Sequence, residues 1–101
     1  MTQRNTYRSS LLTGMACLFA VACTSAPVQE MSDARQAVAA ARDAGAAKNS
    51  PAQFQAAEQY LQQAQDLLQH YRYREARKSA KLAKAQAVQA RQETVAHQHA
   101  E

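Results

Sequence analysis

The chain has 101 residues and a formal net charge of +4, a length that allows one domain. Its hydrophobic content of 47% is mostly alanine, Ile and Trp are absent, and residues 23–101 hold only nine Leu, Val and Phe side chains. Such a composition builds a thin core, and there is no Gly-rich phosphate loop or Cys-x-x-Cys pair, so we expect neither an enzyme nor a cofactor.

The first 22 residues have the pattern of a secretory signal peptide. Arg4 and Arg8 give a positive start, residues 11–21 are apolar, and small residues follow at 20–22. The apolar run is well short of the roughly 20 residues that span a bilayer. We therefore expect cleavage between Ala22 and Cys23, which removes two positive charges and leaves a net charge of +2.

The residues around this bond, Ala20-Val21-Ala22-Cys23, resemble the lipobox of bacterial lipoproteins. That resemblance implies that Cys23 is acylated and anchors the chain in a membrane. Because Thr24 rather than Asp follows the cysteine, it also implies the periplasmic face of the outer membrane of a Gram-negative bacterium. Lipoboxes usually carry Leu where this chain has Ala20, and an ordinary secreted protein would be cut at the same bond, so a secreted chain without lipid stays an alternative.

Residues 23–30 then read as the lipidated cysteine and a short tether, and an Ala-rich helical domain is expected over residues 31–101. The first predicted helix covers residues 31–45, with Ser32 or Asp33 as its N-cap and Gly45 as its stop. Its buried stripe repeats at spacings of three and four residues: Met31, Ala34, Val38 and Ala41.

The second predicted helix covers residues 51–70. Ser50 precedes a first-turn proline and is followed three residues later by Gln53, which is the signature of a capping box. An apolar seam follows at heptad spacing: Phe54, Ala57, Leu61, Ala64 and Leu68.

The third predicted helix covers residues 73–97, after a break in the pattern near residues 69–73. Its stripe consists of alanines at spacings of three and four: Ala76, Ala80, Ala83, Ala87 and Ala90. Facing alanine seams allow helices to approach closely at the shallow crossing angle of bundles. We predict an all-α fold, a short three-helix antiparallel arrangement in which an αα-hairpin packs against an N-terminal helix.

This plan resembles a family of small bacterial lipoproteins that is defined only as a domain of unknown function, some members of which place the same helices before an OmpA-like domain. The resemblance rests on Ala44-Gly45-Ala46, Ser50-Pro51-Ala52, Ala57 with Tyr60-Leu61, and the segment Tyr73-Arg74-Glu75-Ala76-Arg77-Lys78-x-Ala80. Family members usually have Gly-Asp before the turn tyrosine, where this chain has Tyr71-Arg72, so one long bent helix is an alternative to a sharp turn. Alanine-zipper murein lipoproteins are a second resemblance, but this chain has no terminal lysine for their covalent link to peptidoglycan, and Pro51 interrupts a single coiled coil.

Seven cations occur between residues 72 and 91, opposed only by Glu75. At 100° per residue, five of them gather on one side of the third helix, away from the alanine stripe. They form a candidate docking face for an anionic partner, or else a solvated surface that keeps a poor core soluble. The five residues are Arg74, Arg77, Lys78, Lys81 and Lys84.

No catalytic or metal-ligating group is expected. His97 and His99 project to opposite sides of a helix, whereas a metal site needs three or four converging ligands. Export excludes nucleic acid as the partner of the basic face. The sequence therefore predicts a structural or adaptor lipoprotein that meets envelope proteins or peptidoglycan, with self-association left open. The alternative is a binding module for anionic lipid or glycan.

Overall fold

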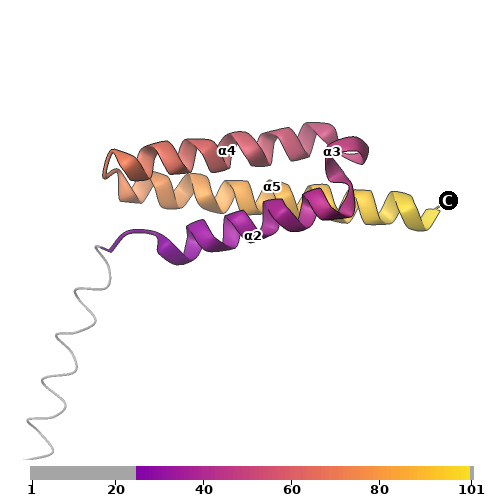
Figure 1. The fold of residues 1–101 in the computed structure, drawn as a ribbon, viewed down its shortest axis with the longest axis horizontal. Helices are drawn as coiled ribbons and strands as arrows, with labels where there is room; N and C mark the ends of the chain where they lie inside the picture. Colours follow the sequence, from indigo (N-terminus) through magenta and orange to yellow (C-terminus); the bar gives the residue numbers. More distant parts are fainter. Residues whose placement is uncertain (1–24, 101) are drawn as a thin grey trace, which may run out of the picture.

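The computed structural model describes residues 25–100, and this part of the chain is helical almost throughout (Figure 1). Its elements are α2 (Val28–Ala44), α3 (Ala46–Asn49), α4 (Pro51–Gln69) and α5 (Tyr73–Ala100). The predicted all-α class is confirmed. The expected short connection between the first two long helices contains one additional helical turn, α3.

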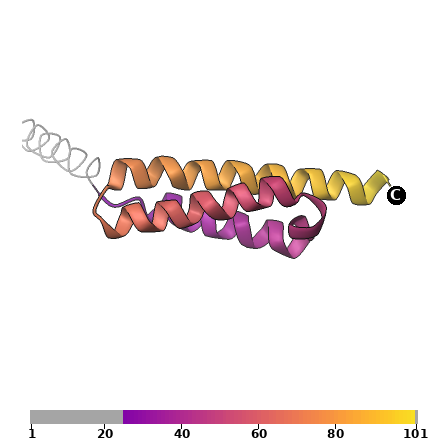
Figure 2. The same cartoon turned by 90° about the horizontal axis from the view of Figure 1, so that it is seen from above.

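The three long helices lie side by side, and the chain reverses direction at α3 and again between α4 and α5 (Figures 1 and 2). Helix α5 packs along both α4 and α2, whereas α2 and α4 touch each other over a smaller area. The hairpin of α4 and α5 with α2 against it is the arrangement expected from the sequence. The C-terminal end of α5 extends past the rest of the bundle in both views.

Helix α2 begins three residues earlier than predicted, so residues 28–30 of the expected tether are helical. Pro27 occupies the N-cap position, is buried, and its carbonyl accepts a hydrogen bond from the Met31 amide at 3.0 Å. Ser32 and Asp33 therefore lie inside the helix, and their predicted capping role is wrong. The end of α2 is as predicted, because Gly45 adopts the left-handed conformation (φ 94°) and its amide donates to the Arg42 carbonyl at 3.0 Å.

The predicted capping box at the start of α4 is also wrong. Ser50 makes no side-chain cap, and its Oγ lies 3.0 Å from Oγ1 of Thr94, inside the bundle. Thr94 is fully buried on α5, where its hydroxyl needs a partner, and Ser50 supplies it. Gln53 donates instead to the Glu93 carboxylate at 3.4 Å. The two predicted capping side chains therefore both join α4 to α5.

A sharp turn separates α4 from α5, which excludes the single bent helix and the single alanine-zipper helix. The Arg72 amide donates to the Leu67 carbonyl at 2.9 Å and the Tyr71 amide to the Leu68 carbonyl at 3.1 Å. These two bonds form a Schellman motif with Tyr71 at its left-handed position, φ 60°. Glycine adopts this conformation without strain, and here a tyrosine adopts it.

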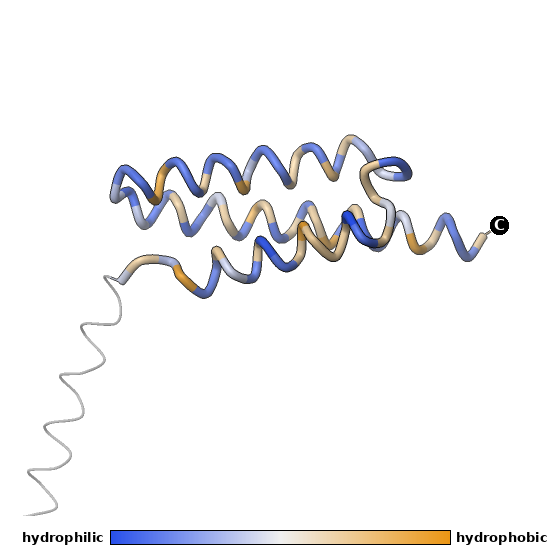
Figure 3. The backbone as a smooth tube through the Cα atoms, in the orientation of Figure 1, coloured by the Kyte–Doolittle hydropathy of each residue, from blue (hydrophilic) through white to orange (hydrophobic). Residues whose placement is uncertain are grey.

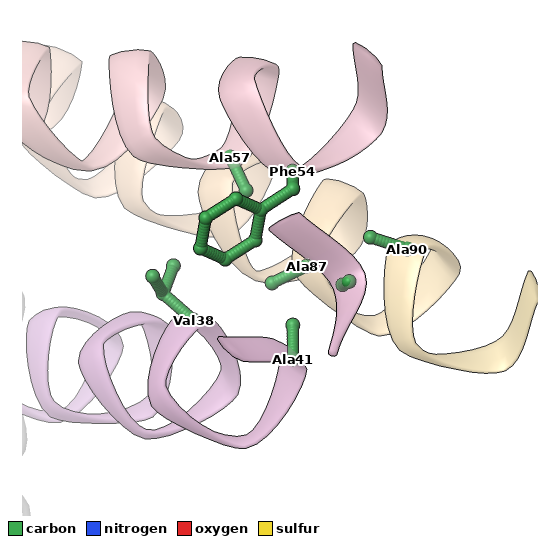
Figure 4. Packing of buried hydrophobic residues seen from close by; sticks show 7 residues of the cluster. Val38, Ala41, Phe54, Ala57, Ala87 and Ala90 are labelled. Carbon is green, nitrogen blue, oxygen red and sulfur yellow. The ribbon is translucent and has the colours of Figure 1, made fainter. Parts of the chain in front are cut away.

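The core follows the predicted stripes closely. All four predicted residues of α2 are buried, as are the five alanines of α5, whereas Leu61 and Leu68 of α4 are only partly buried. Phe54 fills the space between the three helices near α3, against Val38 and the alanines around it (Figure 4). Strongly hydrophobic positions are sparse along the chain (Figure 3), because alanine supplies most of the buried surface.

Candidate functional site

The predicted cleavage and lipidation residues, Ala22 and Cys23, lie outside the described residues. The first described residue is Ser25, two positions after Cys23. The structure therefore bears on the anchor only through the placement of Ser25 relative to the bundle.

Arg77 fastens the start of the described chain to α5. Its Nη2 donates to the Ser25 carbonyl at 3.0 Å, and its Nε donates to Oε1 of Glu30 in the first turn of α2, also at 3.0 Å. Both side chains of this ion pair are largely shielded, at 29% and 28% exposure. As a result, the start of the described chain lies at the end of the bundle where α4 turns into α5 (Figures 1 and 2).

The predicted docking face is divided by these contacts. Arg77 points to α2 rather than outward, and Lys84 lies 3.9 Å from the Asp33 carboxylate of α2. Arg74, Lys78 and Lys81 are exposed and form no ion pair among residues 25–100. The structure thus keeps three of the five predicted residues together as a basic surface and uses the other two to join α5 to α2.

The α4–α5 turn presents aromatic side chains that sequence reasoning did not single out. Tyr71 is 79% exposed, and its ring meets the Tyr73 ring edge-on, with centroids 6.3 Å apart. His70 lies beside Asp66, with Nδ1 2.8 Å from its carbonyl oxygen. The signal is present in the sequence as two tyrosines interleaved with arginines, which indicate a break in helical phase and carry part of the family resemblance but do not by themselves predict a binding surface.

The surface hollows of the described chain are open grooves. One of about 500 Å³ lies between the start of α4 and the last turns of α5, and its lining is mainly apolar. Another of about 280 Å³ lies between α2 and α4, where Arg42 bridges to Glu58 at 3.3 Å and stacks over the Phe54 ring at 5.6 Å. His97 borders the first groove, and residues 25–100 contain no cluster of three metal-ligating side chains.

Residues 29–101 match the family model of a domain of unknown function (DUF4398). Comparisons with curated proteins and with solved structures gave no match. Within the described residues, none of the helices combines the length and the apolar character needed to cross a bilayer. Because the match covers most of the chain, the protein belongs to this family, as the resemblance predicted.

Proposed function

We propose that this member of the DUF4398 family is a membrane-anchored envelope lipoprotein of structural or adaptor type, and that it catalyses no reaction. Acylated Cys23 attaches it to the periplasmic face of the outer membrane, and the helical bundle meets envelope proteins or peptidoglycan. The supporting sequence evidence is the charged start, short apolar run and small residues that precede Cys23.

One structural observation carries the proposal: Arg77, which pairs with Glu30, also holds the Ser25 backbone against the bundle. Only one residue stands between Cys23 and Ser25, so a lipid on Cys23 would be attached to a folded bundle rather than to a long linker. Helix α5 has 28 residues and is about 42 Å long, so its far end stands well away from the point of attachment. A partner would meet that far end, where the larger open groove lies.

Metabolic labelling with palmitate tests the anchor. The wild-type protein should incorporate label and sediment with outer-membrane fractions, and Cys23→Ser should lose both the label and the membrane association. Label retained in Cys23→Ser, or wild-type protein found only in the inner membrane, would contradict the proposal. A photoreactive side chain at Ala96 tests the adaptor role, since adducts to envelope protein or peptidoglycan should form in wild-type cells and disappear with Cys23→Ser.

The second candidate function is recognition of an anionic lipid or glycan by the basic face. The observation in its favour is that Arg74, Lys78 and Lys81 are exposed and form no ion pair among the described residues. Salt separates the two functions. Binding through exposed charges weakens as the Debye length falls below about 10 Å, whereas an apolar contact in a groove persists.

A further inference from the structure

The proposed acylation position is close to the α4–α5 turn. Cys23 precedes Ser25 by two residues, and two residues of extended chain span at most about 7 Å. The Ser25 carbonyl is 3.0 Å from Arg77, which lies four residues, or about 6 Å, along α5 from Tyr73. A lipid on Cys23 would therefore hold this end of the bundle at the level of the lipid headgroups.

Packing in the core does not explain the exposure or the backbone conformation of Tyr71 at this turn. Its side chain is 79% exposed, and its backbone has a φ of 60°, which glycine adopts without strain. Strained residues of this kind cluster where a protein binds something. Tyrosine in particular favours the boundary between lipid and water, because its ring is apolar and its hydroxyl is polar.

The same end of the bundle carries a surplus of positive charge. Residues 72–81 hold five cations and one carboxylate, Glu75, which pairs with Arg72 at 2.6 Å. Arg77 is occupied by Glu30, and Asp66 lies beside His70. By contrast, residues 91–100 at the other end of α5 contain one cation and one carboxylate. Basic side chains attract anionic lipid only within about a Debye length of the membrane surface, so a surplus at the attached end acts where lipid is close.

We propose that the attached end of the bundle docks on the bilayer surface. Tyr71 and Tyr73 lie among the lipid headgroups, and Arg74 and Lys78 contact lipid phosphates. These four residues form the membrane tip. Lys81 is excluded, because it lies about 12 Å along α5 from Tyr73. The inference rests on the proposed acylation of Cys23, and it fixes the orientation of α5, whose C-terminal end points away from the membrane.

Single-tryptophan fluorescence tests the orientation, because the chain contains no tryptophan. The full chain carrying Tyr71→Trp is expressed with residues 1–22, so that Cys23 can be acylated, and is reconstituted in vesicles of equal parts phosphatidylcholine and phosphatidylglycerol, with brominated lipid as quencher. The matched control is Gln92→Trp, an exposed position about 29 Å along α5 from Tyr73. The indole introduced by Tyr71→Trp should be quenched several-fold more strongly than that of Gln92→Trp.

A charge pair tests the role of the cations. In the Tyr71→Trp protein, Arg74→Gln combined with Lys78→Gln should reduce quenching about two-fold in the anionic vesicles, and have no effect in phosphatidylcholine alone. Arg91→Gln, at an exposed arginine far from the tip, should have no effect in either kind of vesicle.

If Gln92→Trp is quenched as strongly as Tyr71→Trp, or neither is quenched although the protein floats with the vesicles, the proposed membrane tip is wrong and the proposed anchor stands. If the protein does not float, the proposed anchor fails and the tip fails with it.

Discussion

The hydrogen bond between Ser50 and Thr94 allows a decisive test of how the bundle is joined at its α3 end. The two hydroxyl oxygens lie 3.0 Å apart, Ser50 is 4% exposed and Thr94 is fully buried. Removing one hydroxyl leaves the other buried without its partner, which costs about 1–3 kcal/mol. Ser50→Ala and Thr94→Val should therefore each destabilise the bundle. Removing both hydroxyls leaves no unsatisfied group, so the double variant should be no less stable than either single variant.

Thermal melts of a soluble chain of residues 24–101 measure this difference by circular dichroism. For a domain of this size, a loss of 1 kcal/mol lowers Tm by about 4–8 °C, so each single substitution is well resolved. A capping box makes the opposite prediction, because the serine would then bond the backbone of its own helix. Ser50→Ala would lower the free energy of unfolding by about 0.5–2 kcal/mol, and by the same amount in the wild type and in Thr94→Val. That additivity, together with a neutral Thr94→Val, would refute the inward hydrogen bond.

Two further predictions concern stability. Phe54→Ala should largely unfold the soluble chain, because truncating a buried Phe costs about 3–5 kcal/mol and the free energy of unfolding of a domain this small is about 5 kcal/mol. Lys81 is exposed, so Lys81→Ala should melt at the same temperature as the wild type. The Tm of Leu61→Ala should lie between those of these two variants, since Leu61 is only partly buried. An equal Tm for all three variants would mean that the alanine seams do not pack as described. Tyr71→Gly should raise Tm by a few degrees, because relief of the left-handed strain, about 1–2 kcal/mol, exceeds the added chain entropy of glycine, about 0.5–1 kcal/mol. Tyr71→Ala removes the same ring but keeps a Cβ, so it should give no such gain, and a gain of equal size would show that the ring, not the backbone, is unfavourable.

The helices and their buried stripes could be predicted from sequence because helical periodicity is local. Alanines spaced by three and four residues can form a common face only on a helix, and Gly45 adopts without strain the left-handed conformation that ends α2. The caps could not be predicted in the same way. Ser50 satisfies the local rule for a capping box, but Thr94, 44 residues away, binds its hydroxyl instead. The turn at Tyr71 was ambiguous for a related reason, since the strain of a left-handed tyrosine is offset by packing between α4 and α5 that no local pattern contains.

The basic face of α5 shows the same contrast between local features, which the sequence predicts, and contacts with distant residues, which it does not. Arg74, Lys78 and Lys81 lie on one exposed side of α5, as predicted, because the side of a helix on which a residue lies depends only on the helix itself. Arg77 and Lys84 share that side in sequence, but their carboxylate partners Glu30 and Asp33 come from α2. The sequence of α5 does not show where α2 lies around it. The sequence was sufficient to find a basic helix but not to show which of its cations hold the fold together.

The two ends of the bundle are held by different interactions, and this bears on what each end can do. Near α3, the buried ring of Phe54 and the Ser50–Thr94 hydrogen bond are out of contact with solvent, so salt should affect them little. At the α4–α5 turn, buried Met31, Ala64 and Ala80 are accompanied by the partly exposed Arg77–Glu30 ion pair and by a left-handed tyrosine, neither of which adds much stability to the free chain. A domain fixed to a bilayer through this end gains contacts there that the free chain lacks, because any contact made only by the folded state adds to its stability.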